Sequence, residues 1–254
     1  MRNLVITFTI LFSSVAAFAE TSDQYIHRSE FFFCNFNEGK SYADLLEEQA
    51  PYEDFLKEKG LQYNRINLLP IWDNDAEYDY VMWGNWPSGQ DQYKEWGAYM
   101  NDYPKWASDN DVPPQNVGDC AKGAVSMRFH SVLRLRIPME DRDERLFTDW
   151  RRCKLTEDAN VAELKALYAK QEKLAKDFGL NGYGVSFFTP YRGNQTGADW
   201  DFLMMTHWYN AESRMNMISS WAEFSDLLED SGIRKERSKH IESCSGADTY
   251  QAHM

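Results

Sequence analysis

Two segments of the chain, one beginning at Cys34 and the other at Cys153, share one sequence pattern. They align without a gap over 28 residues and are identical at nine positions. The identical pairs are Cys34/Cys153, Glu38/Glu157, Ala43/Ala162, Leu45/Leu164, Ala50/Ala169, Glu53/Glu172, Lys57/Lys176, Gly60/Gly179 and Leu61/Leu180. An internal repeat of about 110 residues is too long for a solenoid unit and suits two small domains. We therefore predict two copies of one fold, at residues 28–140 and 141–254.

Each copy alternates strand-like and helix-like segments in the order strand, helix, strand, strand, helix, strand. The ranges predicted as strands are 30–36, 63–69, 78–86 and 124–137 in the first copy, and 183–189, 200–208 and 247–254 in the second. Capping pairs at Ser41/Asp44 and Asn160/Glu163 predict the starts of two helices, and further helices are predicted at 90–103 and 211–229. Pro51 lies inside the first of these helices and predicts a kink or a restart.

This order of elements is that of the ferredoxin-like βαββαβ unit, an α+β fold with the sheet order 4-1-3-2. In that order the last strand lies antiparallel beside the first. Cys34 is near the end of a first strand and Cys120 just precedes a last strand, and the second copy repeats this placement. We therefore expect the disulfides Cys34–Cys120 and Cys153–Cys244. No C-x2-C motif is present and no His stands at ligand spacing from a Cys, so a metal site is not expected.

Two such units in one chain resemble the dimeric α/β-barrel superfamily in its tandem form, which includes antibiotic-biosynthesis-type monooxygenases, NIPSNAP-like proteins and chlorite dismutases. The resemblance rests on topology and duplication, and it implies an intrachain barrel. One face of each sheet would pack on helices and the other would face the lumen. A haem-binding member would need a proximal His on a helix. The nearest residue is His240, which lies in a charged stretch, so no cofactor is expected.

The first nineteen residues have the features of a signal peptide. Arg2 supplies a positive charge, residues 4–18 are mostly apolar, and Ala17-Phe18-Ala19 forms an A-x-A cleavage site. We expect cleavage after Ala19 and a mature protein that is secreted or periplasmic. An oxidising compartment of that kind would allow both disulfides to form.

The charge balance of the chain excludes some partners. Asp and Glu total 40 against 27 Lys and Arg, for a net charge of −13. A chain of this charge is expected to avoid nucleic acid and anionic membranes. The second copy already supplies the partner sheet that a single unit would obtain by dimerising, although the remaining exposed edges leave room for a homo-oligomer.

Two strands in each copy carry the candidate site residues. In the ranges 78–86 and 200–208, one face is almost wholly apolar, whereas the other mixes apolar bulk with polar groups, as a ligand cavity requires. On the mixed face we single out Trp83, Asn85, Met205 and His207, because the two copies differ at these matched positions. The alternative for His207 is a histidine that is hydrogen-bonded at a strand end.

The closing strand of the first copy adds two further candidates. Arg128 and His130 alternate there with apolar residues, and His253 is the counterpart of His130. Arg128 is a candidate ligand contact. His130 and His207 are candidate general bases, because a histidine titrates near neutral pH. We expect Trp83, Asn85, His130, Met205 and His207 to converge on one pocket.

Three functions fit these features. The leading hypothesis is an exported protein that binds a small apolar or aromatic molecule in the barrel cavity. The first alternative is a cofactor-independent enzyme of the monooxygenase or cyclase kind that uses a cavity histidine as its base. The second alternative is a structural or interaction module whose lumen is filled by side chains. The chain contains no phosphate loop, no G-x-S-x-G and no H-E-x-x-H, so common hydrolases and kinases are not expected.

Overall fold

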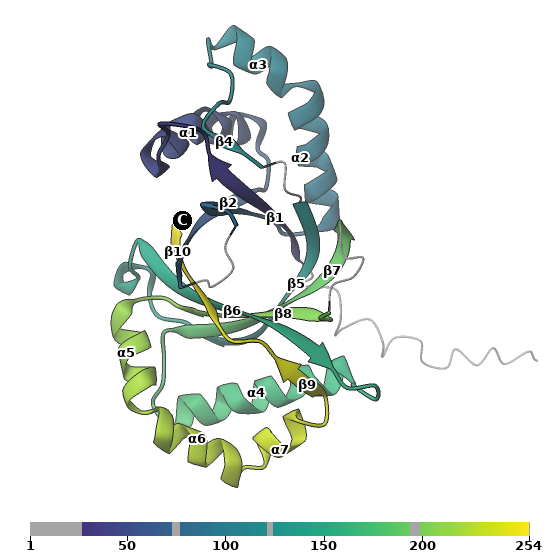
Figure 1. The fold of residues 1–254 in the computed structure, drawn as a ribbon, viewed down its shortest axis with the longest axis vertical. Coiled ribbons are helices and arrows are strands. Elements are labelled where there is room, and N and C mark those ends of the chain that lie inside the picture. Colours follow the sequence, from purple (N-terminus) through teal and green to yellow (C-terminus); the bar gives the residue numbers. More distant parts are fainter. Residues whose placement is uncertain (1–26, 73–76, 121–123, 194–198, 254) are drawn as a thin grey trace, which may run out of the picture.

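A closed antiparallel barrel lies at the centre of the protein (Figure 1). The computed structural model describes residues 27–72, 77–120, 124–193 and 199–253. The barrel strands are β1 (His27–Phe36), β2 (Asn64–Trp72), β3 (Tyr80–Trp86), β5 (Ala124–Leu135), β6 (Arg145–Leu155), β7 (Tyr183–Gly193), β8 (Phe202–Trp208) and β10 (Asp248–His253). The short strands β4 (Gly118–Asp119) and β9 (Ile241–Cys244) extend β1 and β6.

The order of the strands around the barrel is β10-β2-β3-β1-β5-β7-β8-β6, and the pairing of β10 with β6 closes it. Strands from the first copy therefore follow the order β5-β1-β3-β2, and strands from the second follow β10-β6-β8-β7. Each copy places its last strand beside its first. The two sets meet at the seams β5–β7 and β10–β2.

Helices cover the outside of the barrel in two groups, which lie at opposite ends of the view in Figure 1. The first group is α1 (Tyr42–Lys59), α2 (Gly89–Asn101) and α3 (Tyr103–Asp109), and the second is α4 (Val161–Asp177), α5 (Ala211–Ser219), α6 (Trp221–Asp230) and α7 (Ile233–Arg237). A 3-10 turn, Met139–Asp141, precedes β6. No helix in the described ranges is long and apolar enough to cross a membrane.

The structure contains the disulfides Cys34–Cys120 and Cys153–Cys244, the two pairs expected from the sequence. Each joins the first strand of a copy to the segment just before its last strand. Cys153 and Cys244 are direct partners in the β6–β9 ladder. Both half-cystines on the barrel strands, Cys34 and Cys153, are fully buried.

Side chains from all eight barrel strands meet in the lumen and form one hydrophobic cluster. Its buried members are Phe31, Ile66, Leu68, Val81, Trp83, Met127, Leu146, Trp150, Phe188, Leu203, Met205, Tyr250 and Ala252. Rings on strands that are not neighbours touch across it. The centroid of Phe31 lies 5.0 Å from that of Trp150 and 5.2 Å from that of Phe188. The two copies therefore share this core.

Several local expectations can be compared with the structure. Helix α1 is continuous through Pro51, so the predicted restart is wrong. Buried residues on both sides of the proline, from Leu45 to Leu56, keep one helix face packed, and this packing outweighs the lost hydrogen bond. The predicted helix 211–229 is divided at Ser220 into α5 and α6. The expected signal peptide, residues 1–19, lies outside the described residues.

The two predicted helix caps are present but differ in detail. Ser41 and Asp44 form a reciprocal capping box. The Asn160 side chain accepts hydrogen bonds from the backbone N–H groups of Ala162 and Glu163. The backbone N–H of Asn160 donates to Nδ1 of His240, at 3.3 Å, rather than to a carboxylate. An imidazole thus takes the place that the glutamate holds in a full capping box.

Candidate functional site: a cavity outside the barrel

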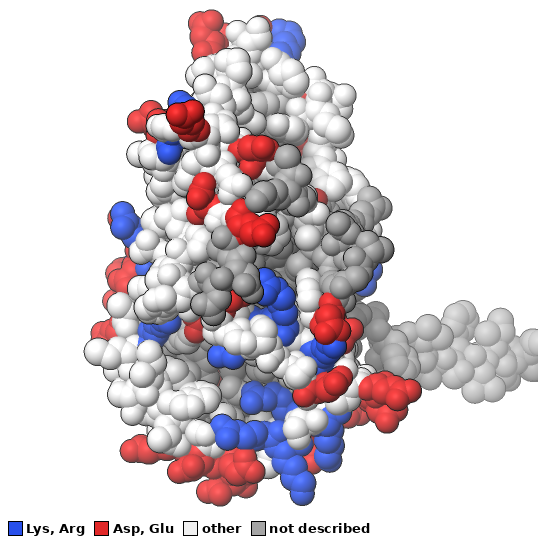
Figure 2. Space-filling model, viewed as in Figure 1, with Lys and Arg blue, Asp and Glu red and all other residues white. Residues whose placement is uncertain are grey.

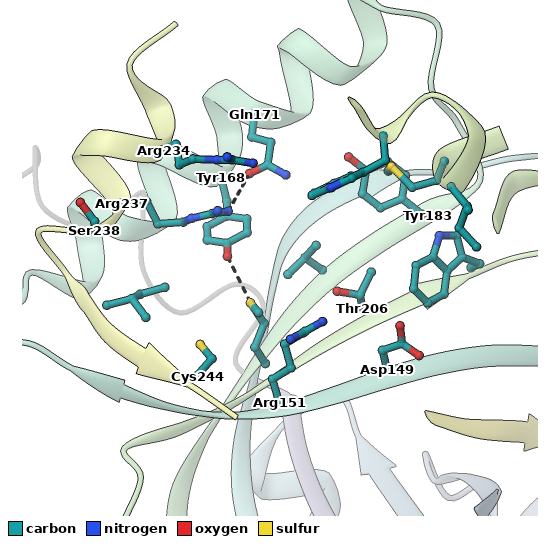
Figure 3. Close-up of a pocket in the computed structure, with 17 residues that line it drawn as sticks. Asp149, Arg151, Tyr168, Gln171, Tyr183, Thr206, Arg234, Arg237, Ser238 and Cys244 are labelled. Carbon is teal, nitrogen blue, oxygen red and sulfur yellow. Dashed lines mark hydrogen bonds between the residues drawn. The ribbon is translucent and has the colours of Figure 1, made fainter. Parts of the chain in front are cut away.

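A cavity of about 690 Å³ lies between the outer sheet face of the second copy and helices α4 to α7 (Figure 3). Its sheet wall comes from β6, β7, β8 and β9. The aromatic and aliphatic lining residues are Tyr168, Tyr183, Val185, Met204, Trp208, Met217, Ile218, Trp221 and Ile241, and the polar ones include Asp149, Arg151, Gln171, Thr206, Arg234 and Arg237. A mostly apolar lining with a few polar groups is the usual composition of a small-molecule site.

One hydrogen-bond donor in this wall, the indole N–H of Trp208, has no partner among the described residues. The buried hydroxyl of Tyr183 interacts with the side chain of Gln171. Trp208 is 7 % exposed and Tyr183 is 2 % exposed. Burial raises the pKa of the Tyr183 hydroxyl, so this group stays protonated at neutral pH. An unpaired buried donor costs about 1–3 kcal/mol, and an acceptor atom of a ligand would remove that cost.

Arg234 and Arg237 enter the cavity from the side opposite Asp149, as Figure 3 shows. Arg237 donates to the side-chain oxygen of Gln171 at 3.4 Å, and Arg234 donates to Ser225 at 2.6 Å. Arg234 also lies 3.8 Å from the carboxylate of Glu229, and Arg237 lies 5.8 Å from the centroid of the Tyr168 ring. These contacts leave part of the five N–H groups of each guanidinium available. Figure 2 shows Lys and Arg gathered over α4, α7 and β9, on a chain whose net charge is −13. This end of the cavity is suited to an anionic group.

At the opposite end, Asp149 is already engaged by protein groups. Its carboxylate accepts a hydrogen bond of 2.7 Å from Thr249 and lies 3.6 Å from the guanidinium of Arg214. That guanidinium in turn lies over the rings of Phe147 and Trp208, at 4.6 and 5.0 Å from their centroids. Asp149 is therefore neutralised within the protein and does not oppose an anion at the arginine end.

The first copy has a smaller cavity, of about 410 Å³, in the corresponding place. There the indole N–H of Trp86, the counterpart of Trp208, donates to Glu95 at 3.2 Å. The hydroxyl of Tyr52 donates to the other oxygen of the same carboxylate. The residue aligned with Glu95 in the second copy is Ser220. The first cavity thus satisfies its own indole, whereas the second leaves the equivalent donor open.

The lumen contains two of the predicted site residues, Trp83 and Met205. Trp83 stacks on Phe31, with 5.8 Å between ring centroids, and donates to the Ser29 hydroxyl at 3.2 Å. Ser29 donates to Asn85 at 2.6 Å. These groups are paired with one another. Neither Trp83, Asn85 nor Met205 lines the second-copy cavity.

His207 lies at the end of β8 and is placed apart from both cavities. Its Nε2 is 3.3 Å from the hydroxyl of Tyr209. Burial lowers the pKa of His207 to about 4, and the nearby Arg134 and Arg142 lower it further in the same direction. A general base works best when its pKa is near the working pH. The environment of His207 therefore does not favour the predicted role as a base at neutral pH.

The remaining candidates, Arg128 and His130, are found on the outer face of β5. His130 Nδ1 lies 3.2 Å from the ammonium nitrogen of Lys165 on α4, and the guanidinium of Arg128 lies over the ring of Tyr191. The pKa of His130 is lowered to about 4, first by burial and then by Lys165 and Arg128. The expected convergence of five residues on one pocket is therefore wrong for His130, which faces the helices and not the lumen.

We expect the His207→Asn variant, which introduces the residue found at position 85, to make stability less dependent on pH. The folded-state pKa of His207 is below its ordinary value of 6.5, so its contribution is present above pH 6.5 and is lost as pH falls towards 4. The wild type should lose up to ~3 kcal/mol from this group over that range. Urea denaturation at pH 7 and pH 4 measures the difference, and equal losses in both proteins would contradict the assignment.

The cavity does not fit an imidazole-ligated haem. None of the described residues that line it is a histidine, and Cys244 is in a disulfide. His240 is 7 % exposed, accepts from the backbone of Asn160 and lies 3.5 Å from Glu163. Within the described ranges, no group of three or more His, Cys, Asp or Glu side chains is placed to hold a metal ion.

Comparisons with known proteins give structural likeness only. No family model matches the chain, and no curated protein matches it. A mutant chlorite dismutase from Candidatus Nitrospira defluvii is 9 % identical with a TM-score of 0.48, covering 90 % of this chain and 92 % of that one. An anthrone oxidase-like protein is 12 % identical with a TM-score of 0.44, covering 91 % and 92 %. A chlorite dismutase in complex with imidazole is 9 % identical with a TM-score of 0.46, covering 90 % and 91 %. Likeness of this degree says nothing about a shared ligand or reaction.

Proposed function

We propose that this protein is an exported binding protein that holds a small molecule in the outer cavity of its second copy. The ligand has an apolar or aromatic body and an anionic group. We also propose that residues 28–140 and 141–254 are two ferredoxin-like units. This proposal keeps the apolar or aromatic body of the leading sequence hypothesis and adds an anionic group. It moves the site from the lumen to the space between the sheet and helices α4 to α7.

The unpaired indole N–H of Trp208 carries the proposal. Trp208 lines a cavity whose other polar end holds Arg234 and Arg237, and its counterpart Trp86 is satisfied by a protein carboxylate. The donor that is satisfied within one copy and left unpaired in the other would be satisfied by an acceptor from outside the chain. The aromatic and aliphatic lining supports an apolar body for the same ligand.

We expect 8-anilinonaphthalene-1-sulfonate, an aromatic anion, to bind this cavity with increased fluorescence. Trp208→Phe keeps the ring but removes the N–H, and it should weaken binding roughly tenfold, because hydrogen bonds to charged groups contribute about 1.5–3 kcal/mol. Arg237→Gln should weaken it to a similar degree. Fluorescence titration of the folded variants measures both effects.

Trp86→Phe is the matched control, since it makes the same change in the first copy, where the N–H is already paired. It should leave the affinity for the dye unchanged. Equal affinity in the wild type, Trp208→Phe and Arg237→Gln would show that the dye binds elsewhere, and the proposed site would then be wrong.

Export has its own test. The proposed cleavage after Ala19 predicts that the protein recovered from its native source begins at Glu20. Intact-mass analysis would detect this end directly. Protein that retains residues 1–19 would contradict the proposal without affecting the cavity.

The enzyme alternative gains no support from the cavity, because neither His207 nor His130 lines it. The filled-lumen alternative shares one observation with the present proposal, namely the hydrophobic cluster that packs inside the barrel. The outer cavity favours the present proposal, since a purely structural module does not need an unfilled space of about 690 Å³.

A further inference from the structure

Three cationic side chains and one histidine gather on the outer face of the barrel where the two copies meet at the β5–β7 seam. They are Arg28 on β1, Arg128 and His130 on β5, and Lys165 on α4. The carbon centres of the two guanidinium groups lie 4.3 and 5.1 Å from the centroid of the Tyr191 ring. His130 and Lys165 are joined by the 3.2 Å contact described above.

The strand register forces the two arginines together. Arg28 and Arg128 are direct partners in the antiparallel β1–β5 ladder. Like charges in directly opposite positions of a sheet are destabilising. Their charges also help to lower the pKa of His130, together with that of Lys165 and burial. The cluster therefore carries an electrostatic cost in the folded protein.

No carboxylate among the described residues offsets this cost. No ion pair or hydrogen bond joins Arg28, Arg128 or Lys165 to an acidic side chain in those ranges. Nε and Nη1 of Arg28 are buried and have no hydrogen-bond partner there. The Nε atom would lie 3.3 Å from a Cβ added at Gly89, the first residue of α2, so the guanidinium also sits at the positive end of a helix.

The second seam, between β10 and β2, provides an internal comparison. The β6–β10 ladder corresponds to the β1–β5 ladder, and it has Phe147 and Gln251 at the positions of Arg28 and Arg128. Leu46 stands at the position of Lys165. His253, the counterpart of His130, lies beside Gln251, with 3.3 Å between the ring nitrogen and the amide oxygen. The β10–β2 seam therefore keeps the histidine and lacks the three permanent charges. The charges are not a requirement of the barrel.

We propose that the β5–β7 seam is a binding site for a small, multiply charged oxyanion of the phosphate type, held by Arg28, Arg128, His130 and Lys165. Guanidinium groups bind such oxygens through paired N–H donors. Nε and Nη1 of Arg28 have no partner among the described residues, and an anion at the seam would supply one. Because β5 belongs to the first copy and β7 to the second, the anion would bind at the junction of the two copies.

Isothermal titration calorimetry with inorganic phosphate in low-salt buffer tests the site. The wild type should bind phosphate, and the double variant R28Q/R128Q should bind it at least roughly tenfold more weakly. K94Q, which removes an exposed charge from α2, should bind like the wild type. Failure of the wild type to bind millimolar phosphate, or unchanged affinity in R28Q/R128Q, would overturn the proposal.

Two further variants keep the result interpretable. If R28Q/R128Q does not fold, K165Q serves in its place and should weaken phosphate binding severalfold, while unchanged affinity would count against the site. R237Q alters the cavity of the proposed function and should leave phosphate binding intact. Binding that is lost in R237Q and kept in R28Q/R128Q would assign the phosphate to the cavity and refute the seam site.

A parallel titration with glycerol 3-phosphate distinguishes a free anion from a phosphate group on a larger molecule. Tighter binding of the ester than of inorganic phosphate would identify a phosphomonoester as the ligand, and the reverse would identify the free ion. Both results require Arg28, Arg128 and Lys165 and support the site.

Discussion

Reduction of the two disulfides is expected to lower the free energy of unfolding by several kcal/mol. The bridges span sequence separations of 86 and 91 residues. Loop-closure entropy predicts a contribution of about 4 kcal/mol from each bridge. Urea denaturation with and without a reducing agent measures the total, and the described residues contain no free cysteine to complicate the comparison.

The double variants C34S/C120S and C153S/C244S separate the two contributions. The two loops do not overlap in sequence, so the two losses are expected to add. Native-state mass mapping without reduction should recover only bridges within a copy. A bridge between Cys34 and Cys153, or a loss below about 1 kcal/mol on reduction, would contradict this account.

Truncation of the shared lumen core should have an effect of similar size. Phe31→Ala and Trp150→Ala remove fully or nearly fully buried rings on strands from different copies and should each lower the free energy of unfolding by about 3–5 kcal/mol. Met100→Ala is the control, because Met100 is 66 % exposed and its truncation should change stability by less than ~0.5 kcal/mol.

The double-mutant cycle between Phe31 and Trp150 tests the contact across the lumen itself. Their ring centroids are 5.0 Å apart with an interplanar angle of 80°. An edge-to-face aromatic pair contributes about 0.5–1.5 kcal/mol beyond its buried area. A coupling energy of zero, with both single variants destabilised, would show that the two copies do not pack on each other through these rings.

The outer cavities of residues 28–140 and 141–254 differ in how they satisfy their buried polar groups. In the first copy, burial raises the pKa of Glu30 to about 7, and neighbouring Glu95 adds to the shift. These carboxylates are held by the protein's own donors, with Gln92 donating to Glu30 at 3.3 Å. In the second copy, Met217 and Ser220 stand at the positions of Gln92 and Glu95. Asp149 keeps a carboxylate at the position of Glu30, whereas the loss of the Glu95 carboxylate leaves the Trp208 N–H unpaired.

The sequences of the two copies contain one signal for this cavity, although Trp86 and Trp208 match each other as a repeated aromatic position. Glu95 accepts the indole N–H of Trp86, and Ser220 stands at its position in the second copy, one residue before the matched Trp96 and Trp221. This change removes the acceptor that the indole of Trp208 would otherwise have. The loss of a partner is visible only when the pairing is known.

Local patterns and the duplication were enough to predict much of the fold. The caps at Ser41 and Asn160, the main strands and the pairing of the four cysteines depend on short-range preferences and on one topological rule, and all can be read along the chain. The unbroken helix through Pro51 depends instead on packing against the sheet, which outweighs a local preference by burying the same helix face on both sides.

The placement of the candidate sites depends on contacts between residues far apart in the chain. Alternation along β5 places His130 and Phe129 on opposite faces of the strand, but it does not show which of the two faces meets α4 and Lys165. Nor does it show that Arg28 faces Arg128, 100 positions later, in the ladder. Sheet register and helix docking are set by the free energy of the whole barrel and not by any one segment. They bring these charges together and leave the Trp208 N–H unpaired, so neither feature can be predicted from a short stretch of sequence.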